Sequence, residues 1–178
     1  MITDINIALK ETIRDIPDFP KEGILFKDIT PIFQKPLLCN KIIERIASDI
    51  KNWNVEVIAG IESRGFLMGV SLAMELDLPF VLIRKKGKLP YNTVSHKYEL
   101  EYGSAEIEMH TDSFKPGQRV LIHDDLLATG GSASAAAELI QKQGGEVAGF
   151  SFLIELAFLN GSERLTPYSE NISTLVAY

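Results

Sequence analysis

The chain has 178 residues, a length that suits one domain and is short for two. Hydrophobic residues make up 46 % of it and charged residues 24 %, which excludes a disordered chain, a collagen and a disulfide scaffold. The net charge of −6 argues against a nucleic-acid partner, although one local basic segment can still hold a small anion.

The amino-terminal region and the cysteine content indicate a cellular compartment. Cys39 is the only cysteine, so no internal disulfide can form and a reducing compartment is favoured. The first residues carry acids at Asp4 and Glu11 and lack the apolar run of a signal peptide. No stretch approaches the length of a membrane span. We therefore expect a cytoplasmic protein without a membrane partner.

The first fifty residues predict two helices separated by an ordered loop. Apolar residues at helical spacing predict a helix over 4–16, which Pro17 ends. Residues 17–31 contain three prolines and a glycine, which is typical of a loop, with an apolar centre at 24–26. A second helix is predicted from about Pro36. The residues predicted on its buried face are Cys39, Ile42, Ile43, Ile46 and Ile50.

The rest of the chain alternates strands with helices. Four short apolar runs without alternation predict buried strands at 55–59, 80–83, 120–122 and 147–154. Helices are predicted from Gly65 through Leu76 and over about 132–143. This order predicts an α/β fold with a parallel sheet covered by helices on both faces. Two alternating runs on either side of Gly103-Ser104 predict a β-hairpin with a two-residue turn.

Three unusual segments follow predicted strands, at 60–65, 84–88 and 124–132. Ligands of parallel sheets bind beyond the carboxyl ends of the strands, so we expect these segments to form one site. The segment 84–88 has four basic residues in five. Alone it would be interpreted as a solvated loop, but its place after a strand in a net-negative protein favours a polyphosphate site.

Residues 120–132 run from a strand through two acids and a glycine-containing loop to the start of a helix. Backbone N–H groups of such a loop bind phosphate at the helix N-terminus, and Thr129 and Ser132 add hydroxyl donors. Asp124 and Asp125 would repel a phosphate, so they suit neighbouring hydroxyls, such as those of a ribose, or its metal. A simple capped turn would need only one acid.

Other common sites do not match the chain. No two glycines have the spacing of a dinucleotide-binding fingerprint, and the only Gly-Lys pair, Gly87-Lys88, is followed by Leu89 rather than by a hydroxyl residue. His96, His110 and His123 lack the spacing of metal ligands. We expect no metal site formed by the protein alone.

The segment 120–132 resembles the phosphoribosyl-pyrophosphate motif of the type I phosphoribosyltransferases. The segments 17–28, 60–66, 83–90 and 98–103 look like the members of that family that act on adenine, in the same order over nearly the whole chain. The resemblance implies one domain over 1–178 with an α/β fold, a parallel sheet flanked by helices and a β-hairpin or flexible lid. Residues 1–34 would form a hood over the base.

The implied reaction transfers the phosphoribosyl group of phosphoribosyl pyrophosphate to adenine, giving AMP and pyrophosphate, with Mg²⁺ held mainly through substrate and water. Water is a competing nucleophile, so we expect the polar segment 89–97 to close as a lid. The resemblance also implies a cis peptide at Glu62-Ser63 and a homodimer, with the basic segment acting partly across the interface. Two alternatives stay open: transfer to another nucleobase, and a non-enzymatic regulator that binds phosphoribosyl pyrophosphate.

The resemblance assigns a role to individual residues. Leu25 and Lys27 would contact adenine through the main chain, with Phe26 and Leu156 on either side of the ring. Glu101 and Arg64 would be catalytic, with Tyr102 beside Glu101, although periodicity alone makes Glu101 an ordinary strand position. The residues implied for phosphoribosyl pyrophosphate are Ser63, Arg64, Arg84, Lys85, Lys88, Asp124, Asp125, Ala128, Thr129, Gly130, Gly131 and Ser132.

Three positions depart from the family pattern. His123 stands where an aliphatic residue is usual, and the sequence offers no reason for it. Ser132 replaces a common threonine and keeps the hydroxyl. Lys27 stands where arginine is frequent, which matters little for a main-chain contact.

Overall fold

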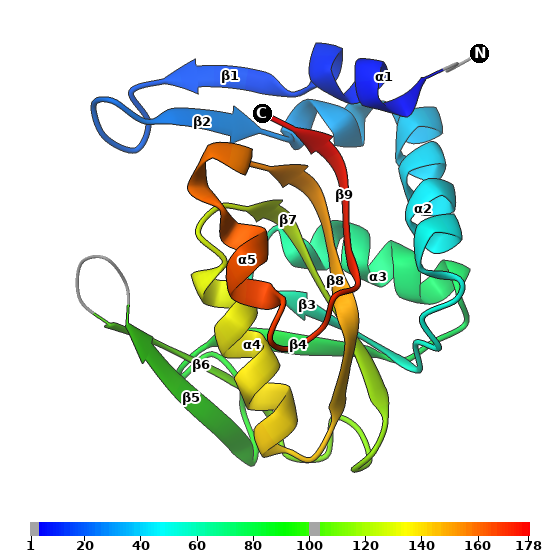
Figure 1. The fold of residues 1–178 in the computed structure, drawn as a ribbon, viewed down its shortest axis with the longest axis vertical. Helices are drawn as coiled ribbons and strands as arrows, with labels where there is room; N and C mark the ends of the chain where they lie inside the picture. The colour runs from blue at the N-terminus through cyan, green and yellow to red at the C-terminus, as the bar shows by residue number, and fades with distance from the viewer. Residues whose placement is uncertain (1–3, 100–103) are drawn as a thin grey trace. The chain divides into compact units, whose positions relative to one another are not determined.

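The structure is a computed structural model that describes residues 4–99 and 104–178. The chain divides into two compact units, Met1–Arg45 and Ile46–Tyr178. Figure 1 shows the elements of both units along the chain. Within the described part of the chain, no helix combines the length and the apolar character needed to cross a bilayer.

The first unit begins with helix α1 (Ile5–Thr12), whose N-terminus is capped by Asp4: its Oδ1 accepts a hydrogen bond from Asn6 N at 2.8 Å. The helix is shorter than the predicted 4–16. Strand β1 (Arg14–Pro17) follows and pairs antiparallel with β2 (Leu25–Asp28), which lies in the predicted loop. Residues 14–16 have helical spacing of apolar residues but form a strand, because they pair with β2. An ion pair between Lys27 and Asp15 at 2.7 Å also joins the two strands.

A 3₁₀ helix η1 (Thr30–Gln34) leads to α2 (Pro36–Ile50), which begins at the predicted proline. The four isoleucines of the predicted face are buried, but Cys39 is only half-buried and Leu38 is in the core instead. The Cys39 thiol donates a hydrogen bond to the Ile32 carbonyl at 3.3 Å. The boundary between the two units falls within this helix.

The second unit is built on a seven-stranded sheet of order β5-β6-β4-β3-β7-β8-β9 (Figure 1). Strands β4, β3, β7, β8 and β9 are parallel, β6 runs antiparallel to β4, and β5 pairs antiparallel with β6. The bounds are β3 Val57–Ile61, β4 Phe80–Lys85, β5 Thr93–Glu99, β6 Ser104–His110, β7 Arg119–Leu127, β8 Glu146–Glu155 and β9 Ile172–Ala177. The four predicted strands are present, and β9 is a strand that was not predicted.

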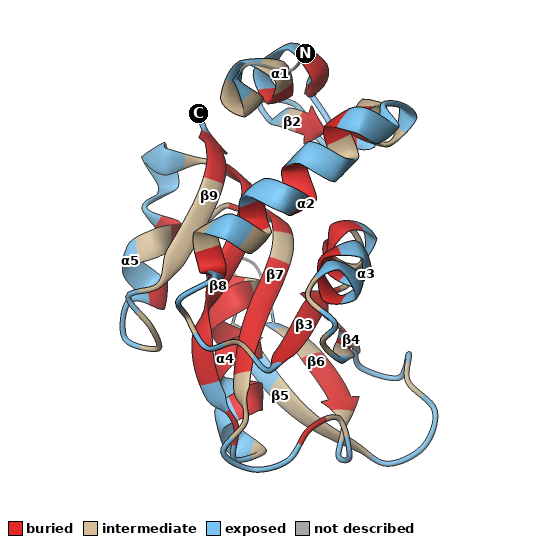
Figure 2. Cartoon of the chain, turned by 90° about the vertical axis from the view of Figure 1, so that its right-hand side faces the viewer, coloured by how far each residue is buried: buried red, intermediate tan, exposed pale blue. Residues whose placement is uncertain are grey.

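Helices cover both faces of this sheet, as predicted. Helix α3 (Gly65–Glu75) packs on β3 and β7, and α4 (Gly131–Lys142) packs on the opposite face (Figure 2). Ala135, Ala136 and Ala137 of α4 are buried, because side chains of this size let the helix approach the strands closely. After β8, η2 (Ala157–Leu159) leads to α5 (Gly161–Leu165), which packs beside α4.

The hairpin differs from the prediction in two ways. Ser104 belongs to β6 and pairs with Glu99, so the predicted two-residue turn at Gly103-Ser104 is wrong. Residues 100–103 lie outside the described residues. Most of the predicted lid segment 89–97 is also strand, because β5 begins at Thr93. Val94 and Tyr98 of β5 pack against the core, which holds this polar segment on the sheet.

Candidate active site

The three segments after β3, β4 and β7 meet at the carboxyl edge of the sheet, as its topology predicts. Arg64, just before α3, places its Nε 3.0 Å from Oδ2 of Asp125 in β7. Glu62 accepts hydrogen bonds from Arg84 of β4, Nε to Oε2 at 3.2 Å and Nη2 to Oε1 at 3.3 Å. The peptide between Glu62 and Ser63 is cis, as the resemblance implied.

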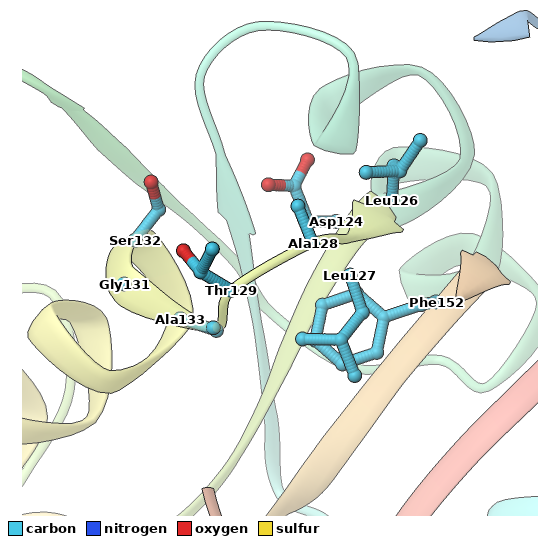
Figure 3. A pocket seen from close by; sticks show the side chains of 10 residues that line it. Asp124, Leu126, Leu127, Ala128, Thr129, Gly131, Ser132, Ala133 and Phe152 are labelled. Carbon is cyan, nitrogen blue, oxygen red and sulfur yellow. The ribbon is translucent and has the colours of Figure 1, made fainter. Parts of the chain in front are cut away.

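The loop from β7 to α4 has the geometry of an anion site. Gly130 is the N-cap of α4 and has φ +76°, and a Cβ at this position would lie 2.7 Å from the Gly161 carbonyl oxygen. Figure 3 shows the Thr129 and Ser132 hydroxyls and the Asp124 carboxylate on the same side of this loop. The pocket there is lined by Asp124, Leu126, Leu127, Ala128, Thr129, Gly130, Gly131, Ser132, Ala133 and Phe152.

The two acids at the end of β7 have different surroundings. Asp125 is buried and faces Arg64, whereas Asp124 is half-buried and accepts a hydrogen bond from Asp125 N at 2.9 Å. Burial and then the neighbouring charge of Asp125 raise the pKa of Asp124 well above its usual value. Burial also raises the pKa of Asp125, which the Arg64 guanidinium partly opposes. A ligand that donates hydroxyl groups is favourable beside such a pair.

The start of α3 packs directly against the acid pair. A Cβ at Gly65 would lie 2.7 Å from the His123 carbonyl oxygen and 2.9 Å from Asp124 Oδ1. This close approach explains the glycine that follows Arg64, since any larger residue would push α3 away from β7.

The basic segment is held by Glu62. Its Oε2 also accepts a hydrogen bond from Lys85 N at 3.0 Å, and Arg84 Nη1 donates to the Lys88 carbonyl at 3.0 Å. Burial alone would raise the pKa of Glu62, but the hydrogen bonds from Lys85 and Arg84 outweigh it and lower the pKa. Arg84 and Lys85 therefore end β4, and hydrogen bonds hold the backbone of the turn that follows, while the side chains of Lys85, Lys86 and Lys88 are exposed to solvent.

His123 belongs to the core of the sheet rather than to the pocket. It is fully buried on β7, and its Nδ1 lies 3.3 Å from the Ser151 hydroxyl on β8. Its Nε2 has no hydrogen-bond partner among the described residues. Burial lowers the pKa of His123 to about 4, so the ring is neutral near pH 7.

The residues predicted for adenine lie in both units. Phe26 is half-buried in β2, where its ring meets that of Phe19 edge-on with centroids 5.1 Å apart. Leu25 of β2 is exposed, Lys27 is buried, and Leu156 follows β8 in the second unit. The placement of Phe26 and Leu156 around a ring stays a prediction. Glu101 and Tyr102 lie outside the described residues.

Sequence reasoning missed two acids that organise this edge, Glu62 and Glu108. Alternation along 105–109 predicts Glu108 on a polar face, yet it is buried. It receives hydrogen bonds from Lys88, Leu89 and Thr93, which are 15 to 20 positions away in the sequence. A pattern in a short stretch of sequence cannot predict contacts over this separation, which depend on the order of strands in the sheet.

Comparison with known proteins shows the family of this chain. Residues 28–172 match the family model described as "Phosphoribosyl transferase domain". An adenine phosphoribosyltransferase of Cytophaga hutchinsonii is 54 % identical over 171 residues, 96 % of this chain and 94 % of that protein. A second, from Clostridium tetani, is 54 % identical over 170 residues, 96 % of this chain and 98 % of that protein.

Solved structures give the same result. The crystal structure of adenine phosphoribosyltransferase from Thermoanaerobacter pseudethanolicus has a TM-score of 0.93 and 47 % identity, covering 97 % of this chain and 99 % of that one. The fold and the site therefore define a type I phosphoribosyltransferase. More narrowly, the chain belongs to the adenine phosphoribosyltransferase family, whose enzymes act in purine salvage.

Proposed function

We propose that the carboxyl edge of the sheet binds phosphoribosyl pyrophosphate and transfers its phosphoribosyl group to adenine, giving AMP and pyrophosphate. The observation that carries the proposal is the acid pair Asp124-Asp125 beside the loop 128–132, with Arg64 3.0 Å from the second acid. Phosphoribosyl pyrophosphate carries a matching group for each of these features on one sugar. Its 5-phosphate matches the loop, its ribose hydroxyls match the acid pair, and its pyrophosphate matches Arg64.

The 5-phosphate binds the loop Ala128, Thr129, Gly130, Gly131 and Ser132. Backbone N–H groups at the N-terminus of α4 and the two hydroxyls donate to its oxygens, and the helix dipole favours the negative charge. The ribose 2- and 3-hydroxyls donate to Asp124 and Asp125. These charge-assisted hydrogen bonds hold the sugar with its anomeric carbon toward the base.

The pyrophosphate binds Ser63 and Arg64, with Arg84, Lys85 and Lys88 contributing positive charge. Cleavage at the anomeric carbon leaves positive charge on the ribose ring and negative charge on the departing pyrophosphate. Cations that are already in place stabilise the leaving group without rearranging during the reaction. Arg64 is suited to this role because its guanidinium is ordered by Asp125 before substrate binds.

Mg²⁺ enters with the substrate. Within the described ranges, no group of three or more His, Cys, Asp or Glu side chains is arranged to hold a metal ion. Mg²⁺ usually keeps several waters and binds through one or two carboxylates together with phosphate oxygens, which fits a metal carried by phosphoribosyl pyrophosphate. Bound in this way, it neutralises charge on the leaving pyrophosphate.

Adenine binds through the main chain of Leu25 and Lys27, with its ring between Phe26 and Leu156, and residues 1–34 act as the hood. Supporting this, β2 is an ordered strand of a compact unit rather than a free loop. Glu101 is the carboxylate that stabilises positive charge on the purine as N9 attacks.

We also infer that the protein works as a homodimer in the cytoplasm. One face of α3 exposes Leu67, Val70 and Met74 by 49, 42 and 78 %, and Leu82 of β4 is 37 % exposed. Apolar side chains spaced along one helix face suit an interface between copies. Phosphoribosyl pyrophosphate is highly charged and does not cross membranes unaided, which favours the compartment where it is made.

Pyrophosphate release in a coupled assay tests the proposed function. Adenine, guanine, hypoxanthine and orotate are offered in parallel at equal concentrations with phosphoribosyl pyrophosphate and Mg²⁺. We expect release with adenine alone. Faster release with another base would reassign the substrate, and binding of phosphoribosyl pyrophosphate without turnover of any base would favour a regulator.

A further inference from the structure

We propose that Glu108 is a positioning residue for pyrophosphate: its buried carboxylate fixes the turn 86–89 and so holds the basic segment 84–88 ready for the ligand. The inference rests on the proposed function, because it names what organises the pyrophosphate part of the same site. Glu108 lies on β6, directly opposite Arg84 in the pairing with β4.

Both oxygens of the Glu108 carboxylate accept hydrogen bonds from the turn or from β5. Oε1 accepts hydrogen bonds from Lys88 N and Leu89 N, both at 2.9 Å. Oε2 accepts from the Thr93 hydroxyl at 3.1 Å and lies 3.7 Å from Lys86 Nζ. Glu108 is only 2 % exposed, so these partners replace water almost completely.

The charge of Glu108 is maintained despite its burial. Burial alone would raise its pKa, but hydrogen bonds from Leu89, Thr93 and Lys88 outweigh that effect and lower the pKa. A buried carboxylate is costly without such partners. The turn and the carboxylate therefore stabilise each other, because each satisfies groups that the other would leave unpaired.

Two acids thus hold the basic segment from opposite ends. Glu62 binds Arg84 and the Lys85 backbone, and Glu108 binds the backbone of Lys88 and Leu89. The side chains of Lys85 and Lys88 are exposed, so an anion can reach both ammonium groups. The charge of Lys88 also helps to lower the pKa of Glu62. A fixed backbone lowers the entropy lost when these side chains bind a ligand.

The direct test is calorimetric titration of inorganic pyrophosphate, with Mg²⁺ present, into the wild-type chain and three variants. Glu108→Ala removes all the carboxylate contacts, and we expect pyrophosphate to bind on the order of 10-fold more weakly. Glu108→Gln keeps Oε1 as an acceptor for the two N–H groups, so we expect affinity close to wild type. Thr93→Val removes one hydrogen bond with little change of shape, and we expect a loss of about 2- to 5-fold.

Glu106→Gln is the matched control. Glu106 lies on the same strand, and its side chain accepts a hydrogen bond from the Ser95 hydroxyl at 2.6 Å. Its contact with the turn is through the backbone, where its carbonyl accepts from Lys86 N at 2.9 Å, and the change to Gln leaves this bond in place. We expect it to leave pyrophosphate affinity unchanged. Formate, which is small enough to replace the lost carboxylate, should partly restore binding to Glu108→Ala, whereas chloride at equal ionic strength should not.

Kinetics separate positioning from a general loss of structure. In Glu108→Ala the KM for phosphoribosyl pyrophosphate should rise about as much as the dissociation constant of pyrophosphate, while the KM for adenine stays near wild type. Two results would overturn this inference but not the proposed function. One is an equal rise of KM for both substrates in Glu108→Ala, and the other is unchanged pyrophosphate affinity in both Glu108→Ala and Thr93→Val. A wild-type chain that binds no pyrophosphate would overturn the proposed function as well.

Discussion

At the residue scale, the acid pair Asp124-Asp125 is expected to act through the sugar and not through the phosphate. The double change to Asn keeps the shape of both side chains but removes their charge-assisted hydrogen bonds. We expect phosphoribosyl pyrophosphate to bind about 10- to 100-fold more weakly, as measured by calorimetry. Inorganic phosphate, which carries no sugar, should bind as before.

The stability of this double variant provides the control. Burial raises the pKa of both carboxyl groups, which means that holding them charged destabilises the folded chain. The Asn variant should therefore have a Tm at or above that of the wild type. Normal binding and turnover in the variant would show that this pair does not bind the ribose hydroxyls.

His123 predicts a pH dependence of stability. Its pKa is about 4 in the folded chain and near 6.5 when unfolded, so between these values the unfolded chain binds the extra proton. The free energy of unfolding therefore falls as the pH is lowered from 6.5 towards 4, by at most about 1.4 kcal/mol per pH unit from this group. Below pH 4 the contribution is fully lost.

Urea unfolding between pH 4 and 7 measures this slope. The comparison is His123→Leu combined with Ser151→Ala, which removes the buried ring and its hydroxyl partner together. The double variant should lose less stability than the wild type as the pH falls. The raised pKa of Asp124 acts in the opposite direction, but it is present in both proteins. Parallel slopes would show that His123 does not titrate in this range.

Glu101 is predicted from the family resemblance to be catalytic. As N9 of adenine attacks, Glu101 would stabilise charge on the purine, so Glu101→Gln should lower kcat by about 10²-fold with little change in substrate affinity. Glu99→Gln, two residues earlier on the chain, is the control and should have a small effect. The rate of AMP formation in a single turnover is measured for both variants. Equal, minor losses of rate would show that Glu101 has no catalytic role.

At the element scale, the start of α4 is the part of the fold most sensitive to change. Gly130→Ala forces a side chain into a left-handed conformation and places its Cβ 2.7 Å from the Gly161 carbonyl. We expect a loss of stability of about 1–3 kcal/mol and weaker binding of AMP. Gly23→Ala is a control for the backbone effect, since Gly23 also has positive φ but has no atom near its Cβ position.

The elements that were predicted correctly depend on local pattern. The strands β3, β4, β7 and β8 are apolar runs long enough to be recognised without their partners, and the site loop 124–132 is contiguous. The strands β1 and β2 were missed because they form only against each other, across a turn with positive φ at Asp18 and Gly23. β9 was missed although most of its residues are β-branched or apolar, which is a strand signal that the sequence did contain.

The same distinction applies to the candidate site. Asp124, Asp125 and the phosphate loop are neighbours in sequence, so their chemistry can be predicted from spacing. The contacts of Glu62 with Arg84 and of Glu108 with Lys88 join residues 22 and 20 positions apart. They depend on β3, β4 and β6 lying side by side in the sheet, which periodicity does not specify.

At the scale of the whole molecule, the exposed face of α3 predicts assembly. Leu67→Glu together with Met74→Glu places two charges on this face, where both side chains are exposed in the single chain. We expect the pair of changes to convert a dimer into a monomer in analytical ultracentrifugation while leaving the far-ultraviolet circular dichroism unchanged. A wild-type protein that sediments as a monomer with full activity would show that the dimer is not required.

We propose that the loop 128–132 and the acid pair bind the 5-phosphate and the ribose hydroxyls of one phosphorylated sugar. A crystal structure with AMP and pyrophosphate bound tests it most directly. We expect the AMP phosphate on the N-terminus of α4, the ribose hydroxyls on Asp124 and Asp125, and pyrophosphate beside Arg64. An AMP phosphate bound anywhere else, or ribose hydroxyls that avoid both acids, would contradict it.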